Sequence, residues 1–126
     1  MNVVDASGWI EYFIGSAQAE FYAPSIEDAS KLLVPALSLY EVHRYLSRNT
    51  SAAQRNACLD TMRQGQVVDL TDARAIAASE VAQKHKLAMA DAVMYSIARE
   101  FNAIFYTQDS DYQSLPGVRY QARVKN

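Results

Sequence analysis

Cysteine is almost absent from this chain, since Cys58 is the only one among 126 residues. A lone cysteine allows no internal disulfide and no cysteine-based zinc site. It suits a reducing compartment, and we therefore expect the protein in the cytoplasm. The first residues lack the basic segment of a signal peptide, and no unbroken apolar run approaches the roughly 20 residues of a membrane span. We expect a protein that is neither exported nor embedded in a membrane.

An excess of charge of one sign is also missing. The sequence holds 12 Lys and Arg against 14 Asp and Glu, a net charge of −2, so the molecule as a whole does not attract a polyanion. Any contact with a nucleic acid must then be local. Positive charge gathers in a segment with Arg44, Arg48, Arg55 and Arg63 and in a tail with Arg119, Arg123 and Lys125. Four of these, Arg44, Arg48, Arg119 and Arg123, are candidates for binding nucleic-acid phosphates, and solvated helix faces and a polar tail are the alternative.

Glycine and proline are scarce, with four and three residues. The sequence therefore has no glycine-rich phosphate loop and no nucleophile elbow of a Ser/His/Asp hydrolase. Hydrophobic residues make up 50% and charged residues 21% of the chain, which is typical of a folded globular domain. At this length we expect a single domain over residues 1–126.

Short apolar segments alternate with helical periodicity along the chain. Strands are predicted over residues 2–4, 31–34, 66–70, 103–106 and 117–120, the last at an edge of the sheet. Helices are predicted around residues 9–13 and 17–22, from residue 38, and over 52–63, 72–86 and 91–101, with Pro24 and Ser25 marking the passage from the second helix to the next segment. This alternation predicts an α/β fold, a three-layer sandwich with a mainly parallel central sheet of four or five strands.

Acidic residues fall where predicted strands pass into helices or where helices begin. They are Asp5, Glu41, Asp91 and Asp109, with Asp111 two residues further on. Ligands of parallel sheets bind beyond the carboxyl ends of the strands, so we expect Asp5 and Asp109 on that edge and Glu41 and Asp91 at the starts of helices that approach it. Each acid could instead cap a helix or complement its dipole, and Ser38 to Glu41 has the pattern of a capping box. Capping does not favour Asp over Ser or Thr, so their common position favours a shared site.

Carboxylates gathered in this way repel one another. Two unit charges about 4 Å apart cost about 4 kcal/mol at an effective dielectric constant near 20, so a cation or protons must accompany them. Oxygen ligands alone suit Mg²⁺ or Mn²⁺ better than zinc. A water activated at such a site would be a nucleophile for attack on a phosphodiester.

Four stretches of the chain together resemble the PIN-domain ribonucleases, and look closest to the VapC-like toxins of bacterial toxin–antitoxin pairs. They are residues 2–7 (NVVDAS), Glu41, residues 90–92 (ADA) and residues 107–112 (TQDSDY). Their order and spacing are similar to those of the family over essentially the whole chain.

The resemblance implies an acidic quartet of Asp5, Glu41, Asp91 and Asp109 that holds one or two Mg²⁺ or Mn²⁺ ions. Asp111 is similar to an extra acid of some members, Thr107 to the hydroxyl residue before the last acid, and Ser7 to a small polar residue near the first. The implied function is metal-dependent endonucleolytic cleavage of RNA by a toxin, usually a homodimer, whose site a cognate antitoxin blocks. A PIN-like module that no longer cleaves, and that binds RNA or protein, is the alternative.

Overall fold

The computed structural model describes residues 1–124, and five strands form one sheet at its centre. They are β1 (Asn2–Val4), β2 (Leu32–Pro35), β3 (Gln66–Val68), β4 (Ile104–Thr107) and β5 (Val118–Tyr120). Their order is β3-β2-β1-β4-β5, and every neighbouring pair runs parallel. The predicted mainly parallel sheet of four or five strands is confirmed, and it has five.

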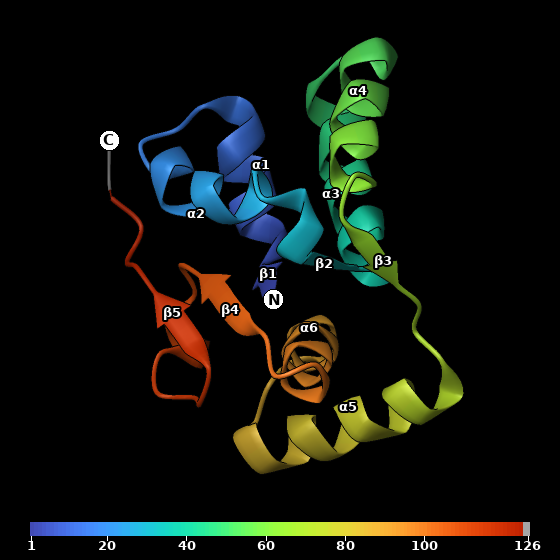
Figure 1. Cartoon of the computed structure of the whole chain (residues 1–126), viewed down its shortest axis with the longest axis vertical. Helices are drawn as coiled ribbons and strands as arrows, with labels where there is room; N and C mark the ends of the chain where they lie inside the picture. Colours follow the sequence, from blue (N-terminus) through green and yellow to red (C-terminus); the bar gives the residue numbers. More distant parts are fainter. Residues whose placement is uncertain (125–126) are drawn as a thin grey trace.

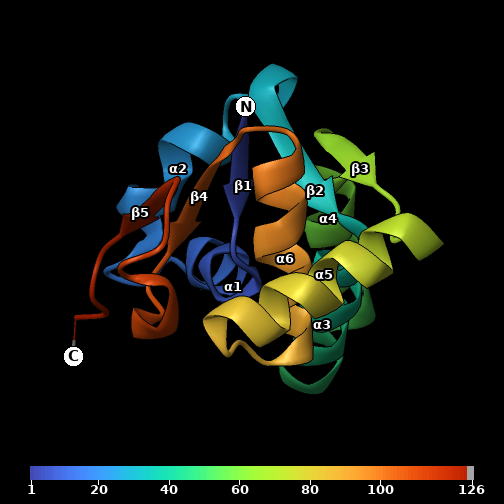
Figure 2. The same cartoon turned by 90° about the horizontal axis from the view of Figure 1, so that it is seen from below.

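Helices cover both faces of this sheet. In Figure 1, α1 (Ala6–Ile14), α2 (Ala19–Ile26), α3 (Ala36–Asn49) and α4 (Ala52–Met62) lie above the strands, and α5 (Asp72–His85) and α6 (Met89–Glu100) lie below. Figure 2 shows α5 and α6 from their own side, in front of the sheet. Two 3-10 turns, η1 (Ala29–Lys31) and η2 (Ser110–Tyr112), precede β2 and follow β4. The predicted three-layer α/β sandwich is confirmed.

Within residues 1–124, no helix combines the length and the apolar character that a membrane crossing demands. The helices gain their stability by packing against the sheet. Their apolar positions belong to one buried cluster that also contains the central strands.

Strands β1 and β2 are buried on both faces and β4 on one, which explains their apolar sequences. Val3, Val4, Leu33, Val34 and Phe105 have no exposed surface. In the register of the sheet, Val3 lies opposite Leu33 of β2 and opposite Phe105 of β4. This packing fixes β1 between β2 and β4 and so determines where the residue that follows each strand lies.

Helix α2 continues through Pro24, so the prediction that Pro24 marks the passage to the next segment is wrong. The proline side chain is exposed, and the carbonyl group of Glu20, which loses its amide partner, can be hydrated instead. Tyr22, Ser25 and Ile26 are buried on the side of α2 that faces the core. Their packing holds the helix together across the proline.

Helix α3 begins at Ala36, directly after β2, rather than at Ser38. Ser38 is fully buried, and its hydroxyl donates to Met94 Sδ of α6 at 3.1 Å, so it does not cap α3. The predicted capping box is therefore wrong, because tertiary packing occupies the serine. The prediction that Glu41 starts a helix is also wrong, because α3 begins at Ala36 and Glu41 lies in its second turn.

Gly8 allows α1 and α2 to approach closely. A Cβ atom at this position would lie 2.5 to 2.8 Å from three atoms of the Tyr22 ring. Tyr22 is fully buried, so its ring has no open space into which to move. The contact between the two helices therefore depends on the missing side chain.

We predict that Gly8→Ala lowers the free energy of unfolding by about 1 to 2 kcal/mol, because overpacking outweighs the gain in helix propensity. Chemical denaturation measures the change. Gly15→Asn is the control, since Gly15 has a φ of +67° and no neighbour within 4 Å, and asparagine tolerates that backbone conformation. A Gly8→Ala protein as stable as the parent would contradict the role given to this contact.

Candidate functional site

The first and last acids of the predicted set lie at the carboxyl ends of the two central strands. Asp5 directly follows β1, and its backbone N–H donates to the carbonyl oxygen of Tyr106 in β4 at 3.0 Å. Thr107, the last residue of β4, donates its hydroxyl to Asp5 Oδ2 at 2.8 Å. The same hydroxyl oxygen accepts from the backbone N–H of Asp109 at 3.0 Å. One buried threonine therefore positions both acids.

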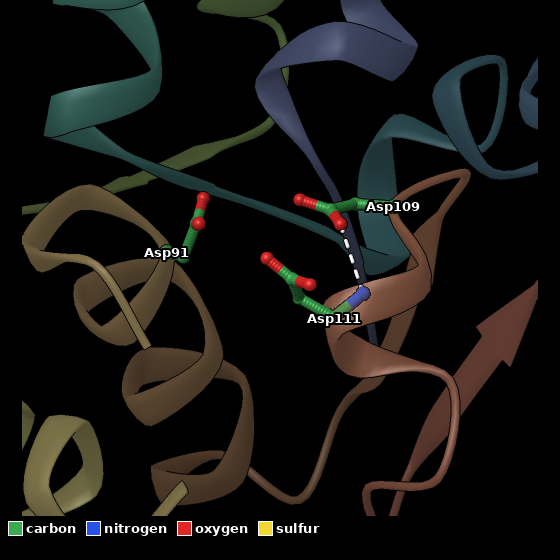
Figure 3. Close-up of side chains that lie close together, drawn as sticks. All are labelled: Asp91, Asp109 and Asp111. Carbon is green, nitrogen blue, oxygen red and sulfur yellow. Dashed lines mark hydrogen bonds between the residues drawn. The ribbon is translucent and has the colours of Figure 1, made fainter. Parts of the chain in front are cut away.

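A group of three acids forms the centre of the site. Carboxylate oxygens of Asp91, Asp109 and Asp111 all lie within 4.8 Å of one another. Asp91 belongs to the first turn of α6, whereas Asp109 and Asp111 belong to the turn that follows β4. Figure 3 shows the three side chains pointing into a common space. Asp109 also accepts the backbone N–H of Asp111 at 2.9 Å, so the predicted cap on this short turn is present.

Asp5 and Glu41 lie around this group, near enough to interact with it electrostatically. Burial is the main cause that raises the pKa of Asp5, from 3.8 to about 7; the hydrogen bond from Thr107 opposes the rise, and the charges of Asp91 and Asp109 add to it. Burial likewise raises the pKa of Glu41, with a further contribution from Asp91. The four acids of the predicted quartet therefore form one electrostatic unit, although they come from the end of β1, from α3, from α6 and from the segment after β4.

The carboxyl group of Asp91 interacts electrostatically both with Asp109 and Asp111 and with the surrounding acids Asp5 and Glu41. Burial raises its pKa, the hydroxyl of Tyr112 opposes that rise, and Asp109 and Asp111 add to it. Tyr112 is fully buried, and its hydroxyl has no partner of normal hydrogen-bond geometry within residues 1–124. Burial is the main cause that raises the pKa of this hydroxyl, and the charges of Asp5 and Asp91 raise it further. Tyr112 ends the TQDSDY stretch but was not expected as a site residue, because the sequence does not show that its side chain lies near Asp91.

Two of the predicted basic residues lie beside Glu41. Arg44 and Arg48 line a hollow of about 290 Å³ along α3, together with Glu41. Tyr40 and Tyr45 belong to the same hollow. Positive charge and aromatic surface therefore occur beside one of the acids, as expected for a surface that meets nucleic acid.

The basic residues near the end of the chain make contacts within the protein. Arg119 Nη1 donates to the Tyr106 hydroxyl at 3.2 Å, and its guanidinium lies 5.7 Å from the centre of that ring. Arg123 forms an ion pair of 3.3 Å with the buried Glu11. Ser7 and Arg123 line a second hollow next to the first. Lys125 lies outside the described residues.

The donor set of the site suits a hard divalent cation. Every candidate ligand atom of the central group is a carboxylate oxygen. Among residues 1–124, no His or Cys belongs to this group. Mg²⁺ and Mn²⁺ prefer such ligands. A bound cation would also offset the mutual repulsion that, together with burial, raises the pKa of Asp5. The residues present therefore fit the group that the sequence predicts.

The fold and the site define a three-layer α/β domain with an acidic centre at the carboxyl end of a parallel sheet. The family model of the PIN domain matches residues 3–118. The chain therefore belongs to the PIN domain family. A search of curated proteins gave no match.

Solved structures with the same fold include several toxin–antitoxin proteins. A toxin–antitoxin complex from Klebsiella pneumoniae is 17% identical with a TM-score of 0.81, over 94% of this chain and 96% of that chain. VapC20 of Mycobacterium tuberculosis, described as a toxin that cleaves the sarcin–ricin loop, is 18% identical with a TM-score of 0.77, over 94% and 97%. VapBC2 of Rickettsia felis, bound to a promoter DNA fragment, is 12% identical with a TM-score of 0.73, over 96% and 97%. The predicted resemblance to VapC-like PIN domains is confirmed.

We predict that the metal-free protein loses stability as pH rises from about 4 to about 7. The folded state holds the Asp5 proton more tightly than the unfolded state, whose carboxyl titrates near 3.8. The stabilisation by this proton is therefore complete below the pKa of the unfolded state, and it is lost as the pH rises through the pKa of the folded state. The loss is up to about 4 kcal/mol at roughly 1.36 kcal/mol per pKa unit.

Urea denaturation in chelator across this pH range measures the effect. Asp5→Asn should weaken the dependence of the unfolding free energy on pH, because the substituted side chain does not titrate. Asp60→Asn, at a site where the carboxylate is 77% exposed, is the matched control and should keep the pH dependence of the parent. An equal pH dependence in Asp5→Asn and the parent would contradict the assignment of this effect to Asp5.

Proposed function

We propose that this protein is a metal-dependent endoribonuclease that hydrolyses RNA phosphodiester bonds. The observation that carries the proposal is the acidic centre, with oxygens of Asp91, Asp109 and Asp111 within 4.8 Å of one another. Keeping carboxylates together in a half-buried place costs free energy, and a protein gains from it when the site binds a cation. The described VapC20 activity on the sarcin–ricin loop supports RNA as the substrate.

Asp5, Glu41, Asp91 and Asp109 would hold Mg²⁺ or Mn²⁺, with Asp111 as a further ligand. The ion would supply charge neutralisation at the scissile phosphate and lower the pKa of an attacking water. Thr107 orients Asp5 and Asp109 through its two hydrogen bonds. Ser7 lies near the first acid in a hollow at the edge of the site.

We also propose that the whole chain is one PIN-like nuclease domain that acts as the toxin of a toxin–antitoxin pair. The structural neighbours that are toxin–antitoxin complexes support an antitoxin partner. A homodimer in the cytoplasm is part of this proposal. The alternative is a PIN-like module that binds RNA or protein without cleaving, which the intact set of acids argues against.

Metal-dependent cleavage by the purified protein tests the proposal directly. In a time course with total RNA, we expect cleavage with Mn²⁺ or Mg²⁺ and none with chelator. Asp91→Asn should reduce the rate by about 100-fold or more, because it removes one charge from the centre and weakens ion binding. Asp72→Asn, an acid in the first turn of α5 away from the centre, is the matched control.

The outcomes separate the proposal from its alternative. Equal cleavage by Asp91→Asn and the parent would remove Asp91 from the site. A folded, partner-free protein that cleaves in neither metal, yet binds RNA in the presence of chelator, would establish the binding module instead.

The hollow along α3 predicts that Arg44 and Arg48 bind RNA phosphates. For single-stranded RNA in chelator, the slope of log affinity against log salt should fall by about 1.4 in Arg44→Gln/Arg48→Gln, at about 0.7 per phosphate contact. Fluorescence anisotropy with a labelled oligonucleotide measures this slope. Arg63→Gln is the control, since Arg63 pairs with Asp60 on the surface of α4. An unchanged slope in the double variant would place the RNA elsewhere.

A further inference from the structure

A second hollow adjoins the one along α3, with which it shares Tyr45. Its volume is about 230 Å³, and Gln108, directly before Asp109 in the chain, belongs to its lining. Ile10 and Ile14 of α1 and Tyr45 of α3 supply apolar and aromatic surface. The volume is below that of sites for drug-sized ligands, so the hollow suits a single ring system.

One of the two charged residues of this hollow, Glu11, is a carboxylate that the acidic centre does not use. The Glu11 side chain is 5% exposed, and burying a charge is costly unless it is well paired. Both hydrogen bonds that it accepts end on the same oxygen: Gln18 Nε2 and Arg123 Nε donate to Oε2 at 3.2 and 3.3 Å. Within residues 1–124, no group donates to Oε1. Glu11 lines the hollow, so this second carboxylate oxygen is an acceptor available to a ligand there.

Arg123 supplies the complementary donors. Its Nε is used by Glu11, and its terminal nitrogens donate no hydrogen bond within residues 1–124. The Arg123 side chain is 65% exposed, in contrast to its partner. The hollow thus presents a carboxylate oxygen next to guanidinium N–H groups.

Attachment of the chain end does not by itself require this pair. The backbone N–H of Val124 already donates to Gln18 Oε1 at 2.8 Å. Gln18 is 1% exposed, so this neutral hydrogen bond is well shielded. A buried glutamate adds a desolvation cost that the neutral contact avoids.

We propose that this hollow binds a guanine base of the RNA next to the scissile phosphate, with Glu11 and Arg123 reading its edge. The inference rests on the proposed nuclease function. Among the four bases, guanine alone offers two adjacent N–H donors, N1–H and the 2-amino group, beside a carbonyl acceptor, O6. Glu11 Oε1 accepts from the donors, Arg123 donates to the carbonyl, and Tyr45 provides a surface for stacking.

Sequencing the ends of fragments from a degenerate RNA tests the proposal. The parent should cut with guanine enriched at one fixed position relative to the cleaved bond. Glu11→Gln should lower that enrichment about ten-fold or more while metal-dependent cleavage continues, because the loss of a paired base contact removes discrimination. Glu20→Gln is the matched control, since Glu20 is exposed in the first turn of α2 and does not line the hollow.

Each outcome decides the inference. No guanine enrichment in the parent, or equal enrichment in Glu11→Gln, would overturn it. Equal losses in Glu11→Gln and Glu20→Gln would show that the loss is not specific to the hollow and would also overturn it. If Glu11→Gln fails to fold, Arg123→Gln replaces it, because the exposed arginine can be changed with less effect on packing.

A binding measurement separates this inference from the nuclease proposal. In chelator, guanosine monophosphate should shift the NMR signals of the hollow at lower concentration than the adenosine, cytidine or uridine analogues, and the difference should vanish in Glu11→Gln. A protein that cleaves RNA but shows no such difference refutes the guanine site alone. A protein that shows the difference but never cleaves refutes the nuclease proposal alone.

Discussion

The parallel pairing of β1 with β4 is the constraint on which the site depends. It brings Asp5 beside the end of β4, where Thr107 donates to it across 102 positions of sequence. The same threonine accepts the backbone N–H of Asp109, so one side chain couples the sheet to the acids. Without that pairing, Asp5 and Asp109 would lie on separate segments with no common chemistry.

At this edge of the sheet, the burial of the acids disfavours their charged forms. Burial raises the pKa of Asp5 to about 7, so the arrangement of the metal-free site is costly near neutral pH. The surrounding core compensates, because the buried strand β1 pairs with β4, whose Phe105 is fully buried. A rigid sheet edge thus keeps the carboxylates close together, and a bound cation would offset their charge.

Strand and helix periodicity predicted the fold class and the positions of Asp5 and Asp109, because the residue after a buried parallel strand always lies at the same edge. Local patterns failed where tertiary contacts decided. Ser38 binds Met94 in place of capping α3, and Pro24 remains inside α2 because the helix packs on its other side. The roles of Tyr112 and Glu11 could not be predicted, since their partners come from distant parts of the chain.

The central claim is that the acids bind a divalent cation, and anomalous diffraction from crystals soaked in Mn²⁺ tests it most directly. The account predicts an anomalous peak about 2.1 to 2.2 Å from oxygens of Asp91 and Asp109, within the range of hard-cation oxygen ligation. Crystals of Asp91→Asn should show a weaker peak under the same soak. A well-ordered site with no peak, or a peak bound only by other residues, would contradict the account.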